Sequence, residues 1–472
     1  MGSIRVKWTL IIATFCFITG LLKIFNSGSA LLQDDRIAFG KFEHGSAARM
    51  LDSASDTICP PAKPPTYPTT HSWDTFQAVV GPPTLRYRDN LRHDRSYITS
   101  WANAGFTNQF MSYVNMIYLG TISDRIPIIP PFAPDHHIPR SAGVIPFGSL
   151  FNLTHLRTTL RLPLIEWRDL KTLPHPTLDP YSTSSIEHLG CWSASPYDKT
   201  EPTLAVNLVA HLGVDASYTR LPIHTHKQED QNEAHVVLPS IAALVFPGEP
   251  SHPVDWYPFM RESNMGSKLS PEEHLACIDQ LYFSTSGRES FEWEHAWSPA
   301  WRTVGKHLRF TSEMEELARG YLRRAFGVAG DVPPFIAIHV RRGDFALQCA
   351  GAPGSCLPQF KNYTDKVLEI QHELCEKQNI DVSHVLVTSD EQDPAFWADI
   401  RGHQSWAYIN HTVENTLEKL GEWYLPFVEI VAQSMAKGFV GTGDSTFSLV
   451  SKRRVEDWNH GVTRWVQRGQ TH

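Results

Sequence analysis

The run Phe335-Ile-Ala-Ile-His-Val340 limits the possible folds more than any other feature of the chain. It is nearly continuous in apolar residues, which is typical of a strand buried on both faces in a parallel sheet. A helical pattern from Ser312 to Gly327 precedes it. After it, predicted strands at residues 384–388, 406–409 and 438–441 alternate with predicted helices at 363–376, 414–436 and beyond 445. This alternation predicts a Rossmann-like α/β domain over residues 326–472.

A second, weaker α/β pattern occurs in the first half of the chain. The β-prone residues 96–101 precede a helical pattern at 109–122 and a second strand at 125–129. Strand, helix and strand in this order form a βαβ unit, which requires a parallel sheet. Residues 130–300 give no clear order of elements. Because 472 residues exceed one ordinary core, we predict two Rossmann-like domains that face a cleft, the first over residues 96–325.

The N-terminus carries one long apolar segment. From Trp8 to Leu22 every residue is apolar, Thr or Gly, and snorkelling of Lys23 extends the segment to Phe25, nearly enough to cross a bilayer. Arg5 and Lys7 precede it, and positive charge on that side favours a cytoplasmic N-terminus. Residues 1–26 therefore predict a cytoplasmic tip and transmembrane anchor, in a type II single-pass protein of the Golgi or endoplasmic reticulum membrane. A cleaved signal peptide is the alternative.

The residues after the anchor agree with a secretory route. Residues 27–95 predict a stem or linker, because the prolines between positions 60 and 68 prevent a helix or a central strand. Sequons begin at Asn152, Asn362 and Asn410. The net charge of −8 gives no reason to expect a nucleic-acid partner.

The cysteines also fit an oxidising compartment. Six of the seven lie outside the apolar segment, an even set suited to disulfides: Cys59, Cys191, Cys277, Cys349, Cys356 and Cys375. Cys349 and Cys356 bracket a short loop that contains Gly and Pro. We predict a local disulfide between them.

Three groups of polar residues follow predicted strands of the second domain. In an open α/β sheet, ligands bind beyond the carboxyl ends of the strands. Arg341, held by Asp344, can clamp a diphosphate, and Asp390 can accept from the amino groups of a guanine. The glycine turn before Ser445 and Thr446 leads into a helix whose first amides can bind phosphate. An ion pair or a helix cap explains each group separately, but their convergence at one sheet edge favours a ligand site.

Other chemistries are less well supported. Phe447 interrupts the Gly-x-Ser-x-Gly pattern of a serine hydrolase. Two segments could supply metal ligands, Asp135-His-His137 and His224-Thr-His226. Neither has a third ligand at a spacing typical of a metal site. The sequence contains no Asp-x-Asp pair, with which many sugar-nucleotide enzymes hold a divalent ion. We therefore expect neither a metal nor another cofactor.

Four motifs resemble the GDP-fucose O-fucosyltransferase family. They are Gly105-Phe-Thr-Asn-Gln109, His339-Val-Arg-Arg-Gly-Asp-Phe345, Val385-Leu-Val-Thr-Ser-Asp390 and Gly441-Thr-Gly-Asp-Ser-Thr-Phe-Ser448. They occur in the family's order over residues 96–455, with the middle third unmatched. The resemblance implies a GT-B fold, GDP-fucose as donor, inversion at the fucose carbon, and no required metal. It makes residues 96–325 the acceptor side and residues 326–472 the donor side.

The same resemblance implies roles for single residues. Arg341 stabilises the leaving phosphate, His339 and Asp344 support the donor pocket, and Asp390 reads guanine. Ser445, Thr446 and Phe447 hold the diphosphate and fucose, while Gly105 and Asn108 reach the substrates from the facing domain. The acceptor is most often a Ser or Thr hydroxyl of a protein.

The first motif departs from the family at one position. Some members carry a glutamate, a candidate general base, where this chain has Ala104. The base is therefore unassigned. The alternatives are a catalytically inactive lumenal binding protein of the same fold, a GT-B transferase that acts on glycans, and one that uses another donor.

Overall fold

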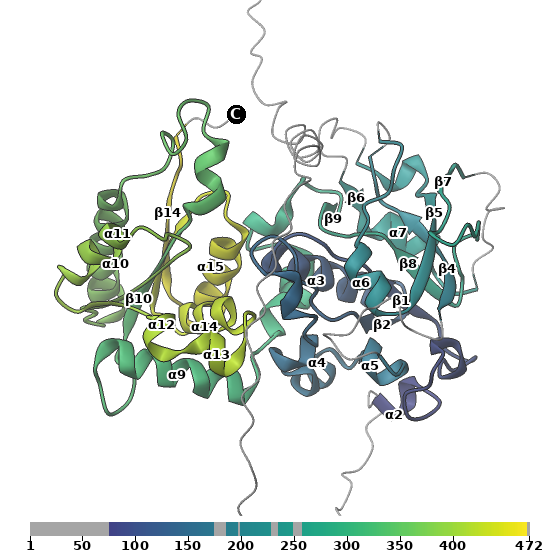
Figure 1. The fold of residues 1–472 in the computed structure, drawn as a ribbon, viewed down its shortest axis with the longest axis horizontal. Helices are drawn as coiled ribbons and strands as arrows, with labels where there is room; N and C mark the ends of the chain where they lie inside the picture. Colours follow the sequence, from purple (N-terminus) through teal and green to yellow (C-terminus); the bar gives the residue numbers. More distant parts are fainter. Residues whose placement is uncertain (1–74, 174–185, 197–198, 228–234, 249–256, 470–472) are drawn as a thin grey trace, which may run out of the picture. The chain divides into compact units, whose positions relative to one another are not determined.

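A computed structural model describes residues 75–173, 186–196, 199–227, 235–248 and 257–469 (Figure 1). Within these ranges no helix is both long and apolar enough to cross a membrane. The predicted anchor at residues 1–26 lies outside the described residues, as does the stem up to residue 74.

Six parallel strands and one antiparallel strand form the sheet of the N-terminal half. The order across the sheet is β3-β2-β1-β8-β4-β5-β7, and only β7 runs antiparallel to its neighbour. The strands are β1 (Tyr97–Ser100), β2 (Ile126–Ile129), β3 (Ile165–Glu166), β4 (Glu187–Ser193), β5 (Val214–Arg220), β7 (Phe259–Arg261) and β8 (Leu275–Ile278). A separate parallel pair joins β6 (Val236–Val237) to β9 (Ser284–Thr285). The predicted βαβ unit is thus confirmed as part of a mixed, mainly parallel sheet.

Helix α3 (Phe106–Ile122) is the central helix of this half. It begins three residues before the predicted start, and thirteen of its seventeen residues are buried. Gly120 lets it pass close to the sheet, because a Cβ there would lie 2.7 Å from Cγ of Pro127. The other helices are shorter: α2 (Thr75–Ala78), α4 (Leu153–Leu160), α5 (Trp167–Leu170), α6 (Val206–His211), α7 (Leu238–Leu244) and α8 (Pro299–Thr303).

Packed structure begins before the predicted start at residue 96. Tyr87 is fully buried, and its ring centroid lies 5.5 Å from that of Trp167. Its backbone N–H donates to the Glu187 carboxylate at 2.8 Å. The predicted stem therefore packs against the first sheet in this part, because aromatic side chains anchor an otherwise irregular segment.

The C-terminal sheet has five parallel strands in the order β12-β11-β10-β13-β14. They are β10 (Phe335–Val340), β11 (His384–Ser389), β12 (Trp406–Tyr408), β13 (Gly438–Thr442) and β14 (Val462–Val466). Side chains alternate along β10, as a strand requires. Ile336, Ile338 and Val340 face the core beneath α10 (Phe360–Gln378), whereas Phe335 and Ala337 join the larger core of the chain. The prediction that β10 is buried on both faces is confirmed.

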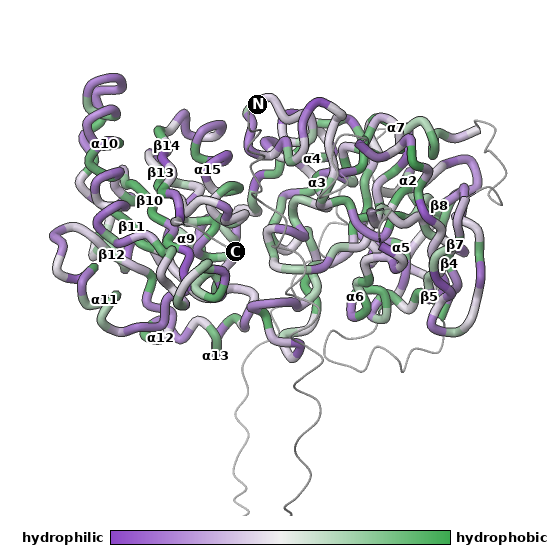
Figure 2. Tube along the Cα trace, turned by 90° about the horizontal axis from the view of Figure 1, so that it is seen from above, coloured by the Kyte–Doolittle hydropathy of each residue, from purple (hydrophilic) through white to green (hydrophobic). Residues whose placement is uncertain are grey.

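Figure 2 shows hydrophilic and hydrophobic residues alternating along α10, as expected for a helix with one face on a sheet. The remaining helices are α9 (Ser312–Phe326), α11 (Pro394–Arg401), α12 (His411–Glu414), α13 (Thr416–Leu420), α14 (Tyr424–Gln433) and α15 (Thr446–Asn459). The predicted single helix over residues 414–436 is wrong. Asn415 and Gly421 both take positive φ angles, so α12 ends at Glu414 and the rest of this segment is divided into α13 and α14. Strand β14 was not predicted.

Residues 71–471 form one compact unit. A single hydrophobic core extends across both halves, and the Phe106 and Phe427 ring centroids lie 5.0 Å apart within it. Trp423 Nε1 also donates to the Gly143 carbonyl oxygen at 2.9 Å. The predicted domain limits at 96–325 and 326–472 stay predictions.

The described part of the chain contains two disulfides. The predicted local bridge between Cys349 and Cys356 is confirmed, and Cys191–Cys277 joins neighbouring strands β4 and β8. Cys375 is exposed and pairs with no described cysteine. Cys59 lies outside the described residues.

Candidate functional site

Arg341 lies directly beyond the carboxyl end of β10, and three side chains hold its guanidinium group. Asp390 and Asp344 accept hydrogen bonds from it and form ion pairs with it. His137 Nε2 lies 2.7 Å from Arg341 Nη2. The side chain is only 14% exposed. The structure therefore brings together the predicted residues Arg341, Asp344 and Asp390 and adds His137 to them.

The Asp390 carboxylate follows β11, the neighbour of β10. One oxygen binds the Arg341 guanidinium, and the other accepts from the Arg342 backbone N–H at 2.7 Å. Gly343 is required beside it, because a Cβ there would lie 2.3 Å from an Asp390 oxygen. Arginine donors thus occupy both oxygens of the group that we predicted to read guanine.

The N-termini of two helices meet beside this cluster. Thr446 begins α15, and its hydroxyl donates to Asn108 Oδ1 at 2.7 Å and lies 2.8 Å from the Thr107 hydroxyl. Both of these residues belong to the first turn of α3, for which Gly105 is the N-cap. Ser445 caps α15 through its side-chain oxygen. Free amide groups and helix dipoles favour an anion at such a meeting point.

His339 lies under the site. Its side chain is 5% exposed, Nδ1 lies 2.7 Å from the Ser448 hydroxyl, and its ring lies 4.8 Å from the Phe447 ring. Burial, and to a smaller extent the charge of Arg341, lowers the pKa of His339 to about 3. The imidazole is therefore neutral at physiological pH and supports the site by packing and by one hydrogen bond.

The loop that contains Asp135 and His137, for which the sequence predicts no ligand site, lies at the same place. Asp135 Oδ2 accepts from the Ala104 backbone N–H at 2.7 Å, and Ala104 takes a positive φ of 66°. Burial and the charge of Arg341 lower the pKa of His137, so its Nε2 is an acceptor for the guanidinium group. The sequence shows Asp135-His-His137 as a candidate metal site that lacks a third ligand, and its spacing gives no sign of the contact with Arg341. No group of three metal-ligating side chains occurs among the described residues.

A cavity of about 520 Å³ adjoins the start of α15 on the other side. Ser445 and Thr446 are predicted site residues, but the residues opposite them are not; these belong to the segment after β8 and to the end of β14 with Gln467. No order of elements could be predicted for the first of those segments. The cavity is lined by Tyr282, Phe283, Phe291, Glu294, His295, Gly443, Asp444, Ser445, Thr446, Leu449, Trp465 and Gln467.

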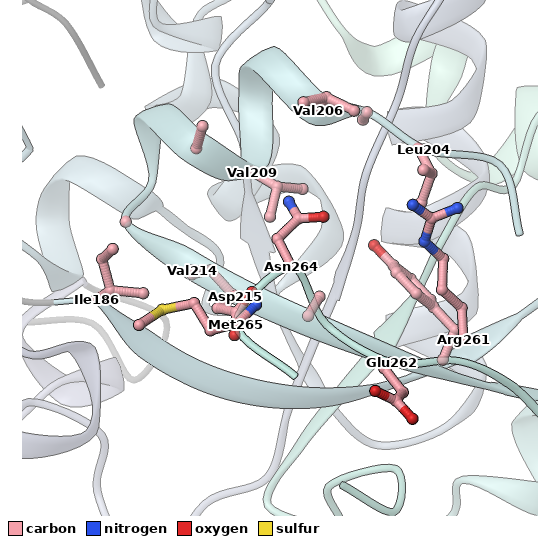
Figure 3. Close-up of a pocket in the computed structure, with 15 residues that line it drawn as sticks. Ile186, Leu204, Val206, Val209, Val214, Asp215, Arg261, Glu262, Asn264 and Met265 are labelled. Carbon is pink, nitrogen blue, oxygen red and sulfur yellow. Dashed lines mark hydrogen bonds between the residues drawn. The ribbon is translucent and has the colours of Figure 1, made fainter. Parts of the chain in front are cut away.

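A smaller cavity of about 110 Å³ lies between β5, α6 and β7 (Figure 3). Its walls are mainly apolar and include Val206 and Val209 of α6 and Met265, while Arg261 and Glu262 also line it. None of the predicted site residues lines it. The cluster around Arg341 and the cavity beside α15 therefore form the candidate site.

Comparison with known proteins gives one family and several structural neighbours. The family model described as GDP-fucose protein O-fucosyltransferase matches residues 97–456. The chain is similar to POFUT1 in complex with GDP-fucose, with 15% identity over 78% of this chain and 98% of that one and a TM-score of 0.47. It is also similar to fucosyltransferase NodZ from Bradyrhizobium, with 11% identity over 76% and 92% and a TM-score of 0.35. No curated protein matches the sequence.

Proposed function

Because this chain belongs to the GDP-fucose protein O-fucosyltransferase family, whose model matches more than half of it, we propose that it fucosylates a Ser or Thr hydroxyl of a protein. It is a fucosyltransferase with GDP-fucose as donor. The protein acceptor, inversion at the fucose carbon and independence of metal are parts of the proposal. So is a GT-B arrangement, with the first sheet on the acceptor side and the second on the donor side.

The observation that carries the proposal is the position of Arg341 beside two helix N-termini. A departing diphosphate gains negative charge, and a fixed guanidinium with nearby amide groups stabilises that charge without rearranging. The carboxylates of Asp344 and Asp390 hold the arginine in place before the donor arrives. Of the three side chains that contact the Arg341 guanidinium, His137 is neutral and binds it most weakly. A phosphate oxygen therefore displaces His137.

The other site residues fit around this centre. Ser445 and Thr446 offer hydroxyl and amide groups to the diphosphate, and Asn108 reaches the same place from α3. Phe447 and His339 form the floor beneath the sugar. Asp390 reads guanine with lone pairs that its arginine contacts leave open. From the apolar N-terminal segment we also propose a Golgi or endoplasmic reticulum membrane location, with the residues after 26 in the lumen.

The test measures binding and turnover of GDP-fucose by the full chain, with GDP-mannose and UDP sugars as competitors and with EDTA. We expect use of GDP-fucose that EDTA does not reduce. Arg341→Lys keeps the charge but loses the planar fork, and we expect kcat/KM to fall by about 100-fold or more. Arg342→Lys is the matched control, because its side chain pairs with Glu391 instead. A folded chain that binds no guanine nucleotide would contradict the proposal.

A further inference from the structure

Transfer to a hydroxyl group requires a group that accepts its proton, and the residues around Arg341 do not supply one. The carboxylates of Asp344 and Asp390 are both occupied by ion pairs with the guanidinium. His339 is buried, and its Nδ1 is bonded to Ser448. The base must therefore come from another part of the site.

The cavity beside α15 lies on the side of the site away from Arg341. All strands of the C-terminal sheet are parallel, so their carboxyl ends meet at one edge. Along this edge Arg341 follows β10, the start of α15 follows β13, and Gln467 follows β14. The start of α15 thus separates the arginine from the cavity. In an in-line displacement, the acceptor attacks from the side opposite the leaving phosphate. The cavity beside α15 is open to an acceptor on that side.

One titratable pair at this cavity has the geometry of an oriented base. His295 lines the cavity, and its Nε2 lies 2.8 Å from Glu289 Oε2. A carboxylate only accepts hydrogen bonds, so Glu289 favours the tautomer of His295 with the proton on Nε2 and the lone pair on Nδ1. Among the described residues no hydrogen-bond partner of Nδ1 is present.

The imidazole of His295 is also held and accessible. Its ring stacks on Trp297 with a centroid distance of 5.0 Å and an interplanar angle of 14°. The side chain is 40% exposed, so a substrate can reach it. The remaining walls of the cavity include the aromatic rings of Tyr282, Phe291 and Trp465, which suit contact with an acceptor.

We propose that this cavity receives the acceptor hydroxyl and that His295 is the catalytic base, with Glu289 as its positioning residue. The inference rests on the fucosyl transfer proposed above. The hydroxyl oxygen forms a bond to C1 of fucose while the bond from C1 to the β-phosphate oxygen breaks. GDP leaves with that electron pair, and the hydroxyl proton moves to Nδ1 of His295.

Asp135 and Glu294 are the rival bases, because among the described residues no ion pair engages either carboxylate. Glu294 lines the cavity beside His295, so Glu294→Gln is tested in the same way as His295→Ala. Both oxygens of Asp135 accept backbone N–H groups, from Ala104 and His136. Its loop also supplies His137, which contacts Arg341. Asp135 therefore lies on the side of the leaving phosphate.

The test uses hydrolysis of GDP-fucose by the full chain, with and without sodium azide. Water must lose a proton to a base, whereas azide attacks as an anion and needs none. We expect His295→Ala to slow hydrolysis by about 100-fold or more. Azide should then restore GDP release in this variant and yield fucosyl azide, while GDP-fucose affinity stays unchanged. Glu289→Gln should slow hydrolysis less and move the acidic limb of the pH–rate profile.

The matched control is His188→Gln. His188 Nδ1 lies 2.9 Å from Asp215 Oδ2 with similar exposure, but it does not line the cavity, so hydrolysis should stay at the wild-type rate. The proposal is wrong if His295→Ala hydrolyses GDP-fucose as fast as the wild type, or if azide rescues Asp135→Asn or Glu294→Gln and not His295→Ala. A wild-type chain that does not bind GDP-fucose would instead refute the proposed function.

Discussion

Replacing His339 with Asn should remove part of the acid sensitivity of the fold. Burial lowers the pKa of His339 from 6.5 to about 3, so only the unfolded chain takes up its proton between these values. The unfolded state then binds more protons, and the free energy of unfolding falls as the pH falls through this window. Between pH 7 and pH 5 these two pKa values give a loss of about 2 kcal/mol.

The assay is the Tm of the full chain at pH 7 and pH 5. In a unit the size of residues 71–471, a change of about 2 kcal/mol corresponds to about 2 °C in Tm. The side chain introduced by His339→Asn keeps a polar group beside Ser448 but does not titrate. Between pH 7 and pH 5 the Tm of this variant should therefore fall by about 2 °C less than the Tm of the wild type. Other histidines, including buried His211, contribute equally to both proteins. The exposed His93→Asn is the control, and an equal loss in wild type and His339→Asn would refute the reasoning.

Two further predictions concern stability and are read as changes in Tm. Arg454 is fully buried among aromatic rings, its side-chain nitrogens have no hydrogen-bond partner among the described residues, and burial lowers its pKa to about 9. Arg454→Met should therefore stabilise the fold by about 1–3 kcal/mol, whereas Arg453→Met should destabilise it, because Arg453 donates to a buried carbonyl and to a carboxylate. Replacing Cys191 and Cys277 with Ala opens a loop of 86 residues and should cost about 2–5 kcal/mol, while Cys375→Ala should leave the Tm unchanged.

Local sequence patterns predicted the helices and strands whose residues show a regular pattern of burial along the whole element. Strand β10 is buried on both faces, so its apolar run identified it directly. Helix α3 and strand β2 followed from helical spacing and β-prone residues. Segment 414–436 was misjudged, because its apolar spacing continues through Asn415 and Gly421, where the backbone turns out of the helix. Strand β14 was missed, since four of its five residues are only partly buried and give no strong pattern.

The residues of the candidate site also fall into two groups, those that the sequence could place and those that it could not. Arg341, Asp344, Asp390, Ser445 and Thr446 each follow a strand of one parallel sheet, so their positions in the sequence placed them at one edge. His137 and His295 could not be placed, because neither follows a recognisable strand of that sheet. Their positions depend on how the first half of the chain packs against the second.

The sequence by itself determined the α/β class, the motifs at the strand ends and the local Cys349–Cys356 bridge, because each depends on residues close together in the chain or on one repeated strand geometry. Only the tertiary structure decided which side chains meet. The contact of Thr446 with Asn108 and the contact of Arg341 with His137 join residues hundreds of positions apart. The physical reason is that such contacts follow from the packing of two sheets around a shared core, which no local pattern of residues encodes.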